Sequence, residues 1–229
     1  MLARLLAALP SQCAVCRRWQ GQPLCEGCVQ RFAQPEPRCN TCALPITGGA
    51  AQCGECLRHP PPLDACICAV AYAYPWSDCI ARYKFRQQPG WAAALAELLR
   101  HAPWVEPALE CADLVLPMPL SPQRLRERGF NQALEIARRL APAKTDARLL
   151  LRIRDTTPQL SLSAAERARN VRGAFALEPL RAHRLRGLDV VLVDDVMTSG
   201  ASLFAAARTL REGGAARVTA VVLARTAKT

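Results

Sequence analysis

VVLVDDVMTSGAS, residues 190–202, is the stretch that decides the fold. Its apolar run 190–193 predicts a buried β-strand. Asp194 and Asp195 follow directly, and open α/β sheets bind their ligands at the carboxyl ends of the strands. Two adjacent carboxylates suit the paired hydroxyls of a ribose and can help to hold Mg²⁺. The stretch therefore predicts a sugar-binding edge of a sheet.

The turn after the carboxylates consists of small residues, Thr198-Ser199-Gly200, and a helix is predicted from about 201 to 212. Small residues let backbone N–H groups come close to a phosphate, and the hydroxyl groups of Thr198 and Ser199 can donate further hydrogen bonds. The start of the helix adds the positive end of its dipole. We expect a phosphate cradle here, and an ordinary strand, turn and helix is the structural alternative.

Strands and helices alternate along the chain from residue 61. Strands are predicted at 65–74, 113–120, 188–193 and 217–224, and helices at 91–100, 131–140 and 201–212. This alternation favours an α/β fold with a mostly parallel sheet. The run Pro60-Pro61-Pro62 is a stiff link that cannot continue a helix. We expect it to separate a small domain, residues 1–60, from a larger one, residues 61–229.

Eight of the twelve cysteines form four C-x-x-C pairs within the first 56 residues: Cys13, Cys16, Cys25, Cys28, Cys39, Cys42, Cys53 and Cys56. A C-x-x-C turn brings two thiolates onto one ion, so four turns supply two closed, tetrahedral zinc sites. We expect two structural Zn²⁺ ions, each held by two consecutive pairs. Pairing of the first turn with the third is one alternative, and an iron–sulfur cluster is another. The remaining cysteines are expected in the core: Cys66, Cys68, Cys79 and Cys111.

The net charge is +11, from 30 basic and 19 acidic residues. A positive field attracts polyanions, so nucleic acid is one expected partner; an arginine-rich phosphate pocket is the other explanation. No apolar run approaches the ~20 residues that span a bilayer. The first ten residues are too short, and too interrupted by Arg4, for a good signal peptide. We therefore expect a cytoplasmic protein without a transmembrane segment.

Residues 190–202 are similar to the thirteen-residue signature of type I phosphoribosyltransferases, and every position fits it. Together with the cysteine pairs, three further segments resemble the ComF family: YKFR (83–86), RLRERGFNQALEIAR (124–138) and TPQLSLSAAERARNVRGAF (157–175). That family joins a double zinc ribbon to a phosphoribosyltransferase-like domain, and the likeness covers nearly the whole chain. It implies a link to natural competence, the uptake of transforming DNA, with single-stranded DNA and DNA-uptake proteins as partners.

The resemblance implies that the ligand is phosphoribosyl pyrophosphate with Mg²⁺. The residues implied to hold the ribose and the 5′-phosphate are Asp194, Asp195, Val196, Met197, Thr198, Ser199, Gly200 and Ala201. Those implied for the pyrophosphate, or for a hood at 154–175 that closes over the ligand, are Lys84, Arg86, Arg124, Arg128, Asn131, Arg167 and Asn170. Arg offers phosphate a fork of donors, and Lys a point charge. For each single cation, a solvated surface position is the alternative.

No residue is assigned as a catalytic group. Purine-salvage relatives use an acid where this chain has Thr198, and its hood region lacks the lysine of orotate-type enzymes. Ligand binding with a role in DNA handling through the basic surface is therefore the first hypothesis. The second is a metabolic phosphoribosyltransferase that acts on an unidentified base or amine. A zinc-dependent interaction protein with a relic pocket ranks last.

Overall fold

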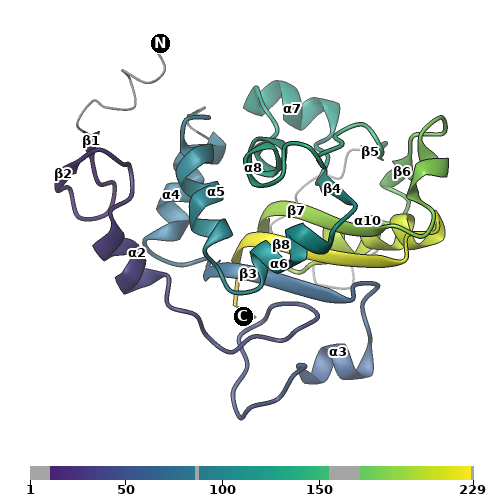
Figure 1. Ribbon diagram of the computed structural model, residues 1–229, viewed down its shortest axis with the longest axis horizontal. Helices are drawn as coiled ribbons and strands as arrows, with labels where there is room; N and C mark the ends of the chain where they lie inside the picture. Colours follow the sequence, from purple (N-terminus) through teal and green to yellow (C-terminus); the bar gives the residue numbers. More distant parts are fainter. Residues whose placement is uncertain (1–10, 86–87, 155–170, 228–229) are drawn as a thin grey trace.

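The computed structural model describes residues 11–85, 88–154 and 171–227. At its centre lies a four-stranded sheet in the order β3-β8-β7-β4, in which all neighbouring strands are parallel (Figure 1). The strands are β3 (Ala65–Ala71), β4 (Leu114–Pro117), β7 (Asp189–Met197) and β8 (Arg217–Arg225). The predicted α/β fold with a mostly parallel sheet is confirmed, and each of these strands overlaps a predicted one.

Both faces of the sheet are buried, as is usual for parallel sheets. Successive side chains of a strand point to opposite faces. In β7, Val190 and Leu192 enter one core, whereas Val191 and Val193 enter the other. The second core lies under four helices, α4 (Trp76–Phe85), α5 (Trp91–Arg100), α6 (Val105–Cys111) and α8 (Gln132–Leu140), and the first lies under α10 (Ala201–Glu212).

The helices predicted from apolar periodicity are confirmed by α5, α8 and α10. Helices α4 and α6 were not predicted. A third unpredicted helix, α7 (Pro122–Arg128), follows β4. Its start is capped by Ser121, whose side chain accepts a hydrogen bond from the Arg124 N–H. Pro122, at the first helical position, has no backbone N–H and so needs no acceptor.

A small antiparallel pair lies beside the main sheet. Strand β5 (Leu150–Arg152) pairs with β6 (Phe175–Leu177), and the short 3₁₀ helix η1 (Ala182–Leu185) follows. The pair flanks the segment in which a hood is expected. Residues 155–170 of that segment lie outside the described residues.

From residue 11, where the description starts, the N-terminal region contains two strands of two residues each, β1 (Ser11–Gln12) and β2 (Trp19–Gln20), and two short helices, α2 (Glu26–Phe32) and α3 (Gly54–Arg58). Helices α2 and α3 begin at the second and fourth cysteine pairs, directly after Cys25 and Cys53. This region packs on the rest of the molecule: Trp76 Nε1 donates to the Phe32 carbonyl at 2.8 Å. Leu44 and Leu63 share one core with the sheet, so the domain boundary at residue 60 stays a prediction.

The four unpaired cysteines differ in their surroundings. Cys66 and Cys79 are buried, as expected, and Cys68 is half-buried. The prediction for Cys111 is wrong, because it ends α6 with an exposed side chain. Within the described ranges, every helix is too short or too polar to cross a membrane.

Candidate functional site

Strand β7 carries both aspartates. It runs to Met197 instead of ending at residue 193, so Asp194 and Asp195 lie inside the strand and not after it. The register explains the extension, because Asp194 pairs with Val222 and Met197 with Arg225 of the long strand β8. Side chains alternate along a strand, so the two carboxylates leave it on opposite sides.

Asp195 is buried and forms an ion pair. Its Oδ1 lies 2.7 Å from Nζ of Lys84, and the two side chains are 7% and 13% exposed. Lys84 belongs to the last turn of α4, which links this helix to the carboxylates. Breaking such a buried pair is costly, because it leaves one charge without compensation. Lys84 is therefore both a neighbour of the site and a support for Asp195.

The carboxyl group of Asp194 has a raised pKa. Burial, and then the charge of Asp195, raises the pKa of Asp194 to about 7, although Lys84 acts in the opposite direction. Its Oδ1 accepts a hydrogen bond from the Asp195 N–H at 2.8 Å. A carboxyl that titrates near neutral pH, in a cavity, is the kind of group that functional sites contain.

The turn after β7 requires glycine at residue 200. Gly200 has φ +82° and precedes α10. A Cβ at this position would lie 2.5 Å from Cε of Met197 and 2.8 Å from Cζ of Phe204. Only glycine fits here without strain, and the tight turn brings the backbone N–H groups to the start of a twelve-residue helix. Helix starts of this kind bind anions.

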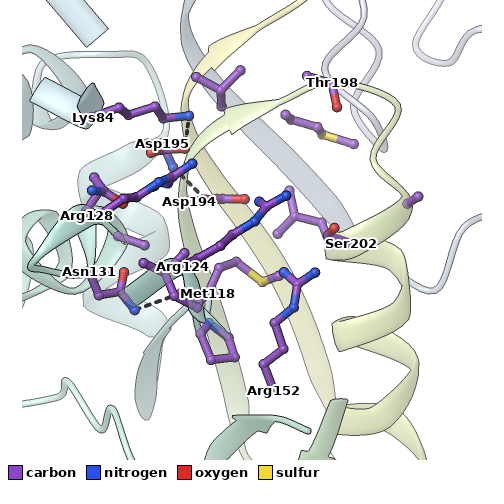
Figure 2. A pocket seen from close by; sticks show the side chains of 18 of the residues that line it. Lys84, Met118, Arg124, Arg128, Asn131, Arg152, Asp194, Asp195, Thr198 and Ser202 are labelled. Atoms are coloured by element: carbon purple, nitrogen blue, oxygen red, sulfur yellow. Dashed lines mark hydrogen bonds and ion pairs between the residues drawn. The ribbon is translucent and has the colours of Figure 1, made fainter. Parts of the chain in front are cut away.

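These groups surround one cavity of about 290 Å³. Figure 2 shows Lys84, Arg124 and Arg128 on one side of it and Thr198 and Ser202 on the other. Twelve predicted site residues line the cavity: Lys84, Arg124, Arg128, Asn131, Asp194, Asp195, Val196, Met197, Thr198, Ser199, Gly200 and Ala201. Three others lie outside the described residues: Arg86, Arg167 and Asn170.

Arg128 and Asn131 are held by neighbours. Arg128 Nη1 donates to Oε1 of Gln132 at 2.9 Å, and its guanidinium lies 5.6 Å from the ring centroid of Phe85. Asn131 Nδ2 donates to the Met118 carbonyl, and its Oδ1 caps α8. Arg128 and Asn131 are thus held in place at the wall of the cavity by these contacts.

The lining of the cavity also includes residues that were not predicted, among them Gln132 and Arg152. Gln132 is 1% exposed, and its Nε2 has no hydrogen-bond partner within the described part of the chain. Arg152 comes from β5, far in sequence from residues 194–201, and lies across the cavity from Lys84 in Figure 2. Gln132 stands beside Asn131 within the segment 124–138 but was not predicted, and Arg152 stands in none of the quoted segments, so the fold is needed to place both at the cavity.

The eight paired cysteines form two clusters. Each cluster joins two consecutive pairs, and its four sulfur atoms lie within 4.8 Å of one another. This grouping confirms consecutive pairing and contradicts the alternative that joins the first turn to the third. Four converging thiols suit a tetrahedral Zn²⁺.

The thiols of one cluster do not titrate alike. Burial acts to raise the pKa of Cys13, but backbone N–H groups of Cys16 and Val15 lower it to about 6. Cys39 is similar: burial acts to raise its pKa, but the Cys53 and Thr41 N–H groups lower it to about 7. Burial raises the pKa of Cys28 and Cys56 far above the usual range. Each cluster thus contains one thiol prepared to ionise, and a cation would be needed to stabilise four thiolates.

A family model of the phosphoribosyl transferase domain matches residues 126–229. The DNA utilization protein YhgH of Salmonella typhimurium is 33% identical over 96% of this chain and 100% of its own length. Competence protein F of Haemophilus influenzae is 32% identical over 88% of this chain and 90% of its own. Competence protein ComFC of Bacillus subtilis is 34% identical over 49% of this chain and 44% of its own.

A crystal structure, that of the protein TT1426 from Thermus thermophilus, covers 64% of this chain and 85% of its own with 21% identity. Its TM-score of 0.31 is too low to carry an argument. Membership of a family rests on the relatives that match 96% and 88% of this chain, because these matches extend well beyond the phosphoribosyl transferase domain at residues 126–229. The chain therefore belongs to the ComF/YhgH family and has a phosphoribosyl transferase domain behind two four-cysteine clusters that are consistent with zinc ribbons.

Proposed function

We propose that this chain binds phosphoribosyl pyrophosphate, together with Mg²⁺, in the cavity at the end of β7. The observation that carries the proposal is the convergence of two carboxylates, a glycine-containing turn and several cations on one cavity. The ribose hydroxyls would bind at Asp194 and Asp195, and the 5′-phosphate at residues 198–201. The pyrophosphate would lie near Arg124 and Arg128, and the two carboxylates would help to hold Mg²⁺, whose charge would offset that of the pyrophosphate.

The experiment is a calorimetric titration of phosphoribosyl pyrophosphate with Mg²⁺ into the wild type, Asp195→Ala and Asp189→Ala. Asp189 begins the same strand, at the end away from the cavity, so it is the matched control. We expect Asp195→Ala to weaken binding about tenfold or more, as the loss of a charged hydrogen-bond acceptor does. Asp189→Ala should bind as the wild type does. A wild type without saturable binding would refute the proposal.

The two cysteine clusters are proposed to hold one structural Zn²⁺ each, within a zinc-ribbon domain that ends near residue 60. The converging thiols support this, because four sulfur ligands leave no coordination position for a substrate. Metal analysis of the purified protein should give two zinc ions per chain. A single zinc would contradict the two-site proposal.

A role in DNA uptake, through single-stranded DNA and uptake proteins, is the finer part of the proposal. Its support is the names of the relatives, DNA utilization protein and competence protein, together with the +11 charge. Contacts to phosphates would be independent of base sequence and sensitive to salt. Absence of affinity for single-stranded DNA at low salt would remove the physical basis of this role.

Phosphoribosyl transfer to an unidentified base or amine is the second candidate. The observation that favours it is Asp194, because a carboxyl with a pKa raised to about 7 by burial can accept a proton near neutral pH. The test is pyrophosphate release from phosphoribosyl pyrophosphate and Mg²⁺ with a panel of bases and amines. Saturable binding without turnover would count against this candidate and leave the binding proposal intact.

A further inference from the structure

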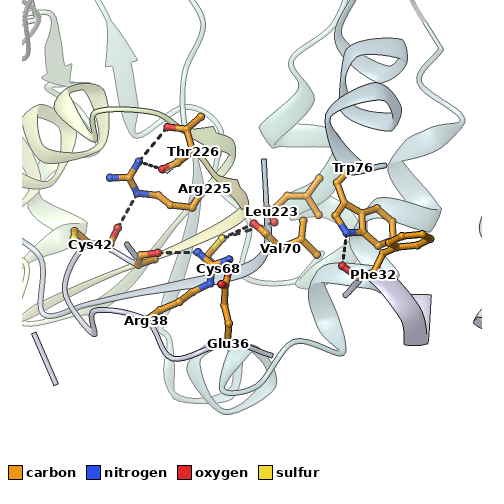
Figure 3. A network of polar contacts seen from close by, with 11 residues as sticks. Phe32, Glu36, Arg38, Cys42, Cys68, Val70, Trp76, Leu223, Arg225 and Thr226 are labelled. Atoms are coloured by element: carbon orange, nitrogen blue, oxygen red, sulfur yellow. Dashed lines mark hydrogen bonds and ion pairs between the residues drawn. The ribbon is translucent and has the colours of Figure 1, made fainter. Parts of the chain in front are cut away.

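Arg225, the last residue of β8, is 4% exposed and is buried against residues 197–201, the proposed phosphate loop. No carboxylate of the described chain lies within ion-pair distance of it. Carbonyl oxygens surround its guanidinium instead: Nε donates to Cys42 at 2.9 Å, and Nη1 donates to Met197 at 3.1 Å, to Thr226 at 3.0 Å and to Thr198. Figure 3 shows this guanidinium between Cys42 and Thr226. A buried charge is costly without such acceptors, so Arg225 fixes the direction of these carbonyls.

The direction of the two loop carbonyls determines where the next amides point. In a trans peptide the C=O and the following N–H point in opposite directions, and the one cis bond found in the described residues is Tyr74–Pro75. Because the carbonyls of Met197 and Thr198 face Arg225, the N–H groups of Thr198 and Ser199 face away from it. Thr198 and Ser199 line the cavity, and the described chain supplies no acceptor for these two N–H groups.

The same guanidinium also contacts the second cysteine cluster through the carbonyl of Cys42. A second connection runs in parallel. The Cys66 N–H donates to the Asn40 carbonyl at 2.7 Å, and the Cys66 thiol lies 3.7 Å from Sδ of Met197. The segment that carries this cluster therefore supports the phosphate loop from behind at two points.

We propose that Arg225 is a positioning residue for phosphate recognition, which turns the N–H groups of Thr198 and Ser199 into the cavity and anchors their loop to the second cysteine cluster. The inference rests on the proposed function for its ligand, a ribose 5-phosphate group. The cation behind the loop also polarises both peptide groups, so their N–H groups become stronger donors to an anion.

The experiment compares Arg225→Met and Arg225→Lys with Arg217→Met. Arg217 is exposed at the opposite end of the same strand, so the control makes the same chemical change away from the loop. Two probes, ribose 5-phosphate and inorganic phosphate, are titrated into each protein. The backbone amide resonances of Thr198 and Ser199 are recorded by NMR in the ligand-free proteins.

We expect Arg225→Met to weaken ribose 5-phosphate binding about tenfold or more, and inorganic phosphate by the same factor, because the contacts to the phosphate are the ones lost. Arg225→Lys keeps the charge but not the fork of donors, so its affinities should lie between those of the wild type and Arg225→Met. Arg217→Met should bind both probes as the wild type does. The Thr198 and Ser199 resonances should shift in both Arg225 variants and stay in place in the control.

Wild-type affinity for both probes in a folded Arg225→Met protein would overturn the proposal, as would equal losses in the Arg217 control. If Arg225→Met does not fold, Arg225→Lys decides: unchanged affinities with unchanged amide resonances would overturn it. If the wild type binds neither probe, the proposed function fails. The amide resonances of the free proteins then still decide whether Arg225 sets the direction of the loop.

Discussion

Replacing Gly200 by alanine tests the geometry of the phosphate loop most directly. A left-handed backbone costs a residue with a side chain roughly 1–2 kcal/mol, and Gly200 has φ +82°. The new methyl would also lie 2.5 Å from Met197 Cε and 2.8 Å from Phe204 Cζ, an overpacking that costs about 1–3 kcal/mol. The sum predicts a loss of about 2–5 kcal/mol in the free energy of unfolding.

Gly187 is the matched control. It has φ +73°, and no atom lies within 4 Å of the position that a Cβ would take there, so Gly187→Ala should cost only the roughly 1–2 kcal/mol of the backbone. Urea unfolding followed by circular dichroism gives both values, and the difference between the variants isolates the overlap. Titration with ribose 5-phosphate should show weaker binding for Gly200→Ala and unchanged binding for Gly187→Ala. Equal stabilities, together with wild-type binding in both, would refute the reasoning.

Three further predictions concern other parts of the molecule. Burial, followed by the charge of Asp195, raises the pKa of Asp194 from 3.8 to about 7, so the stability that its protonated form contributes is complete below about pH 4 and lost as the pH rises through 7. At pH 8 the free energy of unfolding of Asp194→Asn, measured in urea, should therefore exceed that of the wild type by up to about 4 kcal/mol, and at pH 4 the two proteins should be equally stable. The same stability difference at both pH values would contradict this. Trp76→Phe removes the bond to the Phe32 carbonyl and should cost about 1–3 kcal/mol in thermal or urea unfolding, whereas the exposed Trp104→Phe should stay within about 0.5 kcal/mol. Cys25→Ser and Cys53→Ser each alter one cluster, so metal analysis should give one zinc fewer in each; two zincs in either variant would argue against the ligand sets.

The elements with regular apolar patterns could be predicted from the sequence. The run 190–193 and the stripe of α5 bury the same residues that periodicity selects. Helix α4 was missed although its buried residues Trp76, Cys79, Ile80 and Tyr83 stand at the i, i+3, i+4 and i+7 spacing of a helix. The sequence does not show their partners, which lie in distant segments such as α8. Cys111 was misplaced because a single cysteine carries no signal of its burial.

The residues of the candidate site also differ in whether a local sequence pattern or only tertiary packing reveals them. A contiguous loop such as residues 194–201 could be recognised because its chemistry is local. Arg152 could not, since tertiary packing alone brings it to the cavity, whereas Gln132 stands next to the predicted Asn131 in the segment 124–138. Arg225 is the clearest case: at the end of an apolar strand it suggests a solvated charge, yet it is buried among carbonyls.

The hydrogen bond between Arg225 and the Cys42 carbonyl has a thermodynamic consequence. Coupling between two binding sites is reciprocal, so any factor by which metal in the second cluster tightens ligand binding is also the factor by which ligand tightens metal binding. A sugar phosphate in the cavity should then slow the extraction of zinc from Cys39, Cys42, Cys53 and Cys56 by a chelator. The first cluster is an internal reference, because none of the described contacts joins it to the loop. The proposed metal ion and the proposed sugar phosphate would then share one equilibrium.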